Sequence, residues 1–288
     1  MNFLARLFSP ITAILAFIQR YFKSIVFLTI LFMLFGSINK ESLKPTNLMK
    51  IELNGPIFDS EHFLLQIEDA QKENIKGVLL VVNSPGGAVA PSVEMAMAIR
   101  RLKENKPVVA YASGIMASGS YYASIYSSKI IANPGSMIGS IGVIFQSANF
   151  KELADKIGVK EQTVKAGKFK QIGTPTREWK DFEKQELQTM IDDTYDMFVS
   201  DVAKARGLDK SKKSEFADAH VYTARMAKEV GLIDEVGSIY SAKKAIEKLS
   251  GVSLPAWQKK DKIDRLMDKF AIEGVSKVFS YFYGLKAY

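Results

Sequence analysis

The sequence predicts an α/β fold with parallel strands, because apolar strands and helices alternate along its central part. A continuous apolar run at 77–82 is typical of a strand buried on both faces, and a glycine turn and a helix at 88–104 follow it. The same order returns as a strand at 107–112 and a helix from residue 117. A third strand is expected at 129–133. Parallel strands need such crossover connections, so this repetition carries the prediction of the fold class.

The remaining elements of the globular part follow from local patterns. An alternating segment at 49–57 predicts a first strand, and an amphipathic stretch at 60–74 predicts a helix. A 3.6-residue period predicts one long helix over 178–206, which Gly207 ends, and we expect it to serve as core and interface and to cover the functional site. Shorter elements are expected at 223–230, 232–236 and 241–249.

The N-terminal part predicts a membrane anchor. Ser24 to Asn39 is sixteen residues without a charge, short of the ~20 that span a bilayer, although Lys23 and Lys40 can snorkel. Basic residues before the segment favour a cytoplasmic N-terminus. A cleaved signal peptide is the competing interpretation, but no small-x-small cleavage site follows Phe35. We therefore expect a retained single-pass anchor in the inner (cytoplasmic) membrane, with the body on the extracytoplasmic side.

This interpretation gives the domain organisation. The parts are a cytoplasmic or interfacial segment at 1–23, a transmembrane anchor at 24–39, a linker at 40–48, a globular domain at 49–260 and a tail at 261–288. The tail alternates charged and apolar residues and then turns aromatic. Three alternatives remain for the tail, namely packing on a neighbouring subunit, contact with the membrane surface, and disorder.

Composition excludes several kinds of site. The 288 residues contain no cysteine, so disulfides, cysteine metal sites and a thiol nucleophile are absent. Two histidines argue against a His-rich metal site, and we expect neither a metal nor a cofactor. Of the net charge of +8, +4 belongs to residues 1–40, which hold no acid, and the rest is dispersed. Without a tight basic and aromatic patch, nucleic acid is not an expected partner.

Small residues crowd the turn between the strand at 107–112 and the next helix. A hydroxyl residue at such a turn can be presented as a nucleophile, and free N–H groups at the helix start can hold an oxyanion. Ser118 is the candidate. Gly86 and Gly87 end the preceding strand, and without Cβ atoms they let a substrate backbone approach closely. On these stretches alone, close packing and a tight turn remain alternatives, whereas no phosphate-binding pattern is present.

A serine hydroxyl needs a base nearby. His62 lies on an amphipathic stretch before Ser118, His220 lies far downstream, and neither has glycine-framed surroundings. A lysine can serve where burial favours its neutral form. Residues 163–176 contain no acid, although the chain has 31. The pattern does not choose among the lysines of this stretch, and a solvated basic loop is the alternative for all three, which are Lys165, Lys168 and Lys170.

Ordered motifs in the globular part resemble those of the signal peptide peptidase A (protease IV) family. They lie at 83–89, 117–122 and 136–143, within a similarity that runs from about residue 49 to residue 246. That family consists of membrane-anchored serine peptidases, and this chain resembles its short, single-domain form. The resemblance implies a Clp/crotonase-like domain of repeated strand–turn–helix units, preceded by an N-terminal transmembrane helix.

The resemblance also implies roles for particular residues. Ser118 matches the nucleophile, Lys170 matches the general base, and Ser140 matches a serine that hydrogen-bonds and orients that lysine. Gly87 and Gly119 match the backbone N–H donors of the oxyanion hole. These matches imply a serine endopeptidase with a Ser-Lys dyad.

Two positions depart from the family's pattern. Ser120 stands where a second glycine usually follows the nucleophile, and we expect it to be tolerated if its φ is negative. Residues 217–220 stand where many members have a Gly-Arg turn. We expect this second departure to lie away from the chemistry.

The implied substrates are peptides, namely remnant signal peptides and other unfolded segments near the membrane. The implied assembly is a homo-oligomer, a ring or dome whose active sites face an enclosed space. Two alternatives stay open. One is a non-catalytic membrane scaffold on the same fold, and the other is a crotonase-like acyl-CoA enzyme, against which the anchor and the lack of an acid in the glycine motifs argue.

Overall fold

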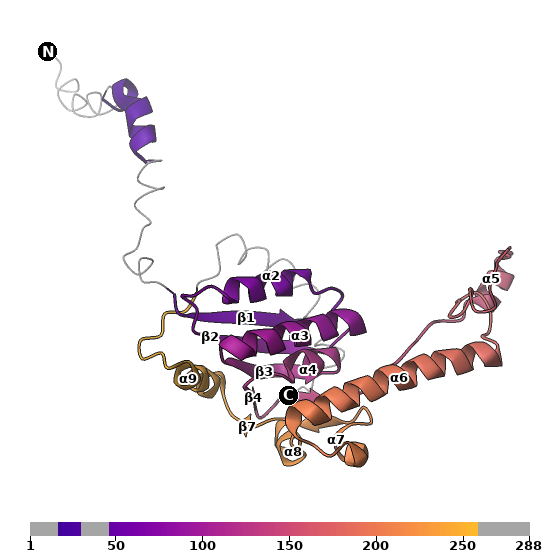
Figure 1. The fold of residues 1–288 in the computed structure, drawn as a ribbon. Coiled ribbons are helices and arrows are strands. Elements are labelled where there is room, and N and C mark those ends of the chain that lie inside the picture. Colours follow the sequence, from indigo (N-terminus) through magenta and orange to yellow (C-terminus); the bar gives the residue numbers. More distant parts are fainter. Residues whose placement is uncertain (1–16, 30–45, 259–288) are drawn as a thin grey trace. The chain divides into compact units, whose positions relative to one another are not determined.

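The computed structural model describes residues 17–29 and 46–258. These ranges belong to two units, Met1–Pro45 and Thr46–Tyr288. Residues 17–29 form a helix, and neither described range contains a helix with the length and apolar character that a bilayer crossing requires. Residues 30–39 of the predicted anchor and the predicted tail at 261–288 lie outside the described residues (Figure 1). The anchor therefore stays a prediction.

A mainly parallel sheet forms the centre of the second unit, which confirms the predicted α/β class. Its main path, all parallel, runs in the order β1 (Leu48–Asn54), β2 (Gly77–Ser84), β3 (Val108–Ala117), β4 (Lys129–Ala132) and β7 (Glu235–Val236). Two short strands extend the sheet beside the end of β3: β5 (Met137–Gly139) pairs with β3 in parallel, and β6 (Val221–Thr223) pairs with β5 antiparallel.

The two faces of the sheet bury different helices, because side chains alternate along each strand. Leu80 and Ala110 face a core shared with α2 (Glu61–Ala70) and α3 (Val89–Asn105). Leu79 and Val109 face the opposite way and pack against Ile246 of α9 (Ile239–Ser250). The other helices within residues 46–258 are α4 (Gly119–Ser124), α5 (Lys151–Lys156), α6 (Asp181–Arg206), η2 (Lys210–Lys212), α7 (Lys213–Phe216) and α8 (Ala224–Glu229).

Most predicted elements are present with shifted ends, but β3 differs in length. The strand expected at 107–112 continues to Ala117, and the helix expected from residue 117 begins at Gly119. Ser113 and Gly114 break the apolar run that marked the strand. The extension forms because Ile115–Ala117 pairs with β5 and because the side-chain oxygen of Asn83 accepts the Ile115 N–H at 3.0 Å. This longer strand carries Ser118 to the edge of the sheet.

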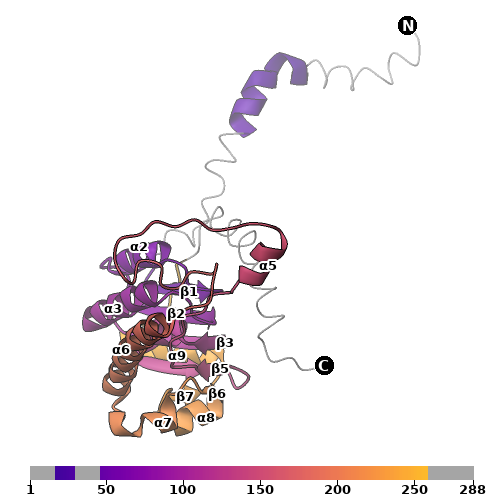
Figure 2. The same cartoon turned by 90° about the vertical axis from the view of Figure 1, so that its right-hand side faces the viewer.

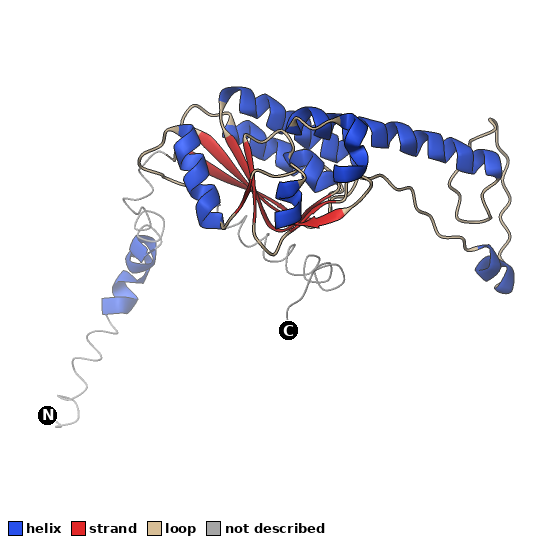
Figure 3. Ribbon diagram, turned by 90° about the horizontal axis from the view of Figure 1, so that it is seen from below, coloured by secondary structure: helices blue, strands red, loops and turns tan. Residues whose placement is uncertain are grey.

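The long predicted helix is α6, and it ends at Gly207, whose φ is 66°. Its second half packs on the body through buried residues such as Phe198 and Val202. Its first half runs out of the body together with the segment that contains α5 (Figures 1 and 3). We call residues 144–190 the arm. Figure 2 looks along the arm toward the body.

Candidate active site

Ser118 occupies the turn between β3 and α4 in a strained backbone conformation. Its φ is 51° and its ψ is −126°, a region that residues with a Cβ rarely adopt. The Ser118 N–H donates to the Gly139 carbonyl at 2.7 Å, and its carbonyl accepts the Tyr122 N–H at 3.0 Å. A sharp strand-to-helix turn of this kind holds a nucleophilic serine clear of the sheet. The structure therefore places Ser118 where the sequence predicts it.

Backbone strain in the described ranges gathers at one cavity. The non-glycine residues there with positive φ are Ser118, Ser140, Asp218 and Ala219. All four line a cavity of about 360 Å³, together with Gly87 and with side chains of α6. Strained residues persist where the surrounding structure holds them in place, and they cluster at functional sites. The fold thus brings Ser118 and Ser140 together.

Gly87 and Gly119 lie beside Ser118 and cannot carry side chains. A Cβ on Gly87 would lie 2.0 Å from the Ile57 carbonyl oxygen, and a Cβ on Gly119 would lie 2.2 Å from Ser92 Oγ and 3.3 Å from the Gly87 nitrogen. In residues 46–258 neither glycine N–H donates to a protein acceptor. Two free N–H groups next to a serine can stabilise an oxyanion. Ser92, which fixes one side of this arrangement by donating to the Ala88 carbonyl at 2.8 Å, carried no signal in the sequence.

An apolar pocket opens beside Ser118 and both glycines. Its walls come from Val89, Tyr122, Val143, Met197 and Phe198. The Tyr122 and Phe198 rings meet edge to face with centroids 4.6 Å apart. Burial, and then the hydrogen bond that the Tyr122 hydroxyl donates to the Asp201 carboxylate, raise the pKa of Tyr122, so the phenol stays a donor. The pocket can accept an apolar side chain.

Ser120 behaves as the sequence predicts. Ser120 is not one of the residues with a positive φ. Its buried hydroxyl donates to the Ser84 carbonyl at 2.6 Å and accepts the Ala117 N–H at 2.9 Å. The serine therefore ties the ends of β2 and β3 together where a glycine would leave a gap.

The expectation for residues 217–220 was wrong. Asp218 and Ala219 line the cavity with Ser118, and the Ser140 N–H donates to the His220 carbonyl at 2.7 Å. The reason is the antiparallel pairing of β5 with β6, which joins segments far apart in the sequence. Neither histidine side chain belongs to the candidate active site, since neither His62 nor His220 lines the cavities at Ser118.

Lys170 lies on the arm and away from Ser118 of its own chain. The ring of its neighbour Phe169 packs on Phe182, with centroids 5.6 Å apart. Phe182 and Phe198 are sixteen residues apart on α6, so at 1.5 Å per residue about 24 Å of helix separates the Lys170 segment from the pocket. Within one chain, the two predicted dyad residues do not meet.

The three lysines of this segment have different surroundings. The Lys168 ammonium lies over the Phe182 ring at 4.6 Å, and Lys165 lies near enough to the Glu183 carboxylate to help lower its pKa. The Lys170 side chain is exposed and has no such partner among the described residues. It is thus the lysine of the three whose amine is free to act elsewhere.

Comparison with known proteins identifies the family. A profile described as "Peptidase family S49" matches residues 100–253. The chain belongs to peptidase family S49. The matched range contains Ser118, Ser140 and Lys170, while Gly87 precedes it.

Individual relatives of the S49 chain carry protease names. It is 42% identical to a protein of Methanocaldococcus jannaschii named as a protease, over 68% of this chain and 64% of that protein. It is 34% identical to a protein of Enterococcus faecium named as a signal peptide peptidase, over 73% and 65%. A protease-named protein of Synechocystis is 36% identical over 70% and 74%. The S49 chain thus spans just under two thirds of the length of the first two.

Proposed function

We propose that this S49 chain is a serine endopeptidase in which Ser118 is the nucleophile and Lys170 the general base. Neutral Lys170 takes the proton of the Ser118 hydroxyl while Oγ attacks the peptide carbonyl carbon. The N–H groups of Gly87 and Gly119 stabilise the oxyanion. Lys170 then gives the proton to the leaving amine, and water hydrolyses the acyl-enzyme. The observation that carries the proposal is the strained turn of Ser118 beside two free glycine N–H groups.

The proposed dyad forms between two copies of the chain. Lys170 is carried away from its own Ser118 by the arm, so it reaches a nucleophile only on a neighbour. Many large apolar side chains of the arm are exposed, as a docking segment requires, and they include Ile144, Phe150, Leu153, Ile157, Val159 and Val164. Docking also buries the lysine, and burial favours the neutral amine. Repeated head-to-tail contacts of this kind close into a ring or dome.

The proposed substrates are remnant signal peptides and other unfolded segments near the membrane. The apolar pocket beside Ser118 supports this proposal, because signal peptides are rich in apolar residues. So does the name of the Enterococcus faecium relative. The anchor at 24–39 would hold the catalytic domain on the extracytoplasmic side of the inner membrane, where such peptides are released.

Cleavage of a signal-peptide substrate by single and mixed variants tests the proposal. Ser118→Ala and Lys170→Ala should each be inactive yet assemble normally. When the two are dissociated, mixed in equal amounts and reassembled, about one quarter of the sites should regain a serine and a neighbour's lysine. Full activity of either single variant would show that the substituted residue is not part of the catalytic machinery, whereas a wild-type protein without activity would support the scaffold alternative. No recovery in the mixture would exclude a dyad shared between copies.

A further inference from the structure

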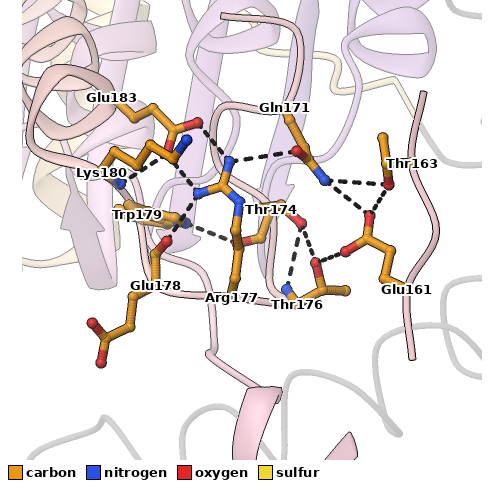
Figure 4. A network of polar contacts seen from close by, with 10 residues as sticks. All are labelled: Glu161, Thr163, Gln171, Thr174, Thr176, Arg177, Glu178, Trp179, Lys180 and Glu183. Carbon is orange, nitrogen blue, oxygen red and sulfur yellow. Dashed lines mark hydrogen bonds and ion pairs between the residues drawn. The ribbon is translucent and has the colours of Figure 1, made fainter. Parts of the chain in front are cut away.

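A polar network at the outer end of α6, where the helix begins, surrounds a buried ion pair (Figure 4). The Glu183 side chain has no exposed surface, and Arg177 donates to both of its oxygens at 2.7 and 2.8 Å. The backbone N–H of Lys180 adds a third hydrogen bond at 2.8 Å. Hydrogen bonding to Arg177 is the main cause that lowers the pKa of Glu183 to about 2. The pair is fully formed at neutral pH.

Contacts with α6 and the polar network hold the chain on both sides of Lys170. On one side, Phe169 packs on Phe182 at the start of α6. On the other side, the Gln171 amide donates to Glu161 at 2.9 Å and lies 3.5 Å from the Arg177 guanidinium. Figure 4 shows the polar contacts among these as one chain of groups from Glu161 to Glu183. The position of Lys170 on the arm is thereby tied to α6.

Stability alone does not account for a buried pair in so exposed a part of the molecule. Removing a carboxylate from water costs free energy that a single partner seldom repays. The other ion pairs of the arm, Lys151 with Asp155 and Lys184 with Asp181, are exposed. A bidentate guanidinium–carboxylate pair instead fixes orientation, because its two parallel hydrogen bonds tolerate one geometry.

We infer that Arg177 and Glu183 are positioning residues, which set the direction in which the arm presents Lys170 to the serine of a neighbouring copy. The inference rests on the proposed function, since it assumes that Lys170 is the base. The pair touches neither the substrate nor the reacting atoms. It acts by holding the segment at 161–177 against the first turn of α6.

Steady-state kinetics of the full chain provide the first test. Glu183→Gln keeps the shape of the side chain, and Arg177→Lys keeps the charge but loses the fork. Each should lower kcat by about tenfold to a hundredfold and leave KM within about twofold, because a small misplacement of a catalytic group acts on the chemical step. Glu186→Gln makes the same change of charge on the exposed side of α6 and should match the wild type.

Mixed assemblies of two variants provide a measurement that would not change if the Arg177–Glu183 pair had a purely structural role. Glu183→Gln reassembled with Ser118→Ala should recover about a quarter of wild-type activity, because the second variant supplies an intact arm to the intact serine of the first. Glu183→Gln reassembled with Lys170→Ala should stay at or below the activity of Glu183→Gln alone. Light scattering should show that the mixtures assemble.

Two results would overturn the inference, and a third would overturn its basis. Wild-type kcat in both Glu183→Gln and Arg177→Lys would show that the pair does not position the lysine. So would a failure of Glu183→Gln to recover with Ser118→Ala, when Lys170→Ala does recover with it. If Ser118→Ala and Lys170→Ala do not complement each other, the shared dyad itself is wrong and the inference falls with it.

Discussion

The backbone N–H of Ser118 donates to the carbonyl of Gly139 at 2.7 Å, and this bond fastens the end of β3 to the end of β5. Ser140, which follows Gly139 in the sequence, has a φ of 50°, close to the 51° of Ser118. Two strained serines are thus held side by side at one edge of the sheet. If Ser118 is the nucleophile and Ser140 orients a lysine, as proposed, this bond keeps the two serines at a fixed separation while the lysine comes from another copy of the chain.

Gly119→Ala should damage both activity and stability. The new Cβ would meet Ser92 Oγ at 2.2 Å, and overpacking of this kind costs about 1–3 kcal/mol. Displacing the proposed oxyanion donor should lower kcat/KM by about a hundredfold or more. Ser92→Ala in the same chain should restore part of the stability, as unfolding in urea would measure. Gly135→Ala, whose Cβ would lie at an ordinary 3.5 Å from Asn133, is the matched control and should be neutral.

Ala219→Gly should stabilise the protein. Ala219 has a φ of 56°, and the left-handed region costs a residue with a Cβ about 1–2 kcal/mol. Glycine loses more chain entropy on folding, so the net gain should be about 0.5–1 kcal/mol in the free energy of unfolding. Ala217, buried with a φ of −117°, gives the comparison, since Ala217→Gly should destabilise. Equal changes in the free energy of unfolding for Ala219→Gly and Ala217→Gly would contradict the backbone strain assigned to Ala219.

Tyr122→Phe should loosen α6 from α4. It removes the hydroxyl that donates to the Asp201 carboxylate, and a hydrogen bond to a charged group contributes about 1.5–3 kcal/mol. Asp201→Asn keeps an acceptor and should cost less. Because Tyr122 also forms a wall of the apolar pocket, the loss should raise KM for apolar substrates. Tyr240→Phe, at an exposed hydroxyl, should change neither the midpoint of thermal unfolding nor KM.

Acid should release the segment at 161–177 from the first turn of α6 before the body unfolds. The pKa of Glu183 is lowered from 4.5 to about 2 in the folded chain. A lowered carboxyl pKa gives stability that is complete above the unfolded value and is lost as the pH falls from about 4.5 toward 2. Trp179, whose indole N–H donates to the Thr174 carbonyl at 2.8 Å, should report the release by fluorescence. In Glu183→Gln this pH dependence should be weaker, and the remainder should come from Glu161, whose pKa is also lowered by hydrogen bonds from Thr163 and Thr176.

Local sequence patterns predict the helices and strands whose formation depends mainly on neighbouring residues. The apolar run of β2 and the 3.6-residue period of α6 depend on neighbouring residues, and both elements appear where they were expected. The extension of β3 to Ala117 was not predicted, because it depends on pairing with β5 rather than on its own side chains. Tertiary pairing decides such boundaries.

The candidate site likewise contains residues that local motifs predict and residues that only long-range contacts bring there. Gly87, Ser118, Gly119 and Ser140 lie in motifs, and the fold gathers them at one edge of the sheet. Ala219 was misplaced because the β5–β6 pairing that brings it there leaves no periodic signal. The distance of Lys170 from Ser118 was not predictable either, since a loop without periodicity does not reveal its direction. The pairing of Ser118 with Lys170 stays a prediction.

The most direct test of the central claim is labelling of the full-length protein with a fluorophosphonate, followed by intact mass and peptide mapping. We predict a single adduct on Ser118 in the wild type and none in Lys170→Ala, because the hydroxyl reacts only when a base accepts its proton. An adduct on another residue, equal labelling of Lys170→Ala, or no adduct on the assembled wild-type protein would contradict the account.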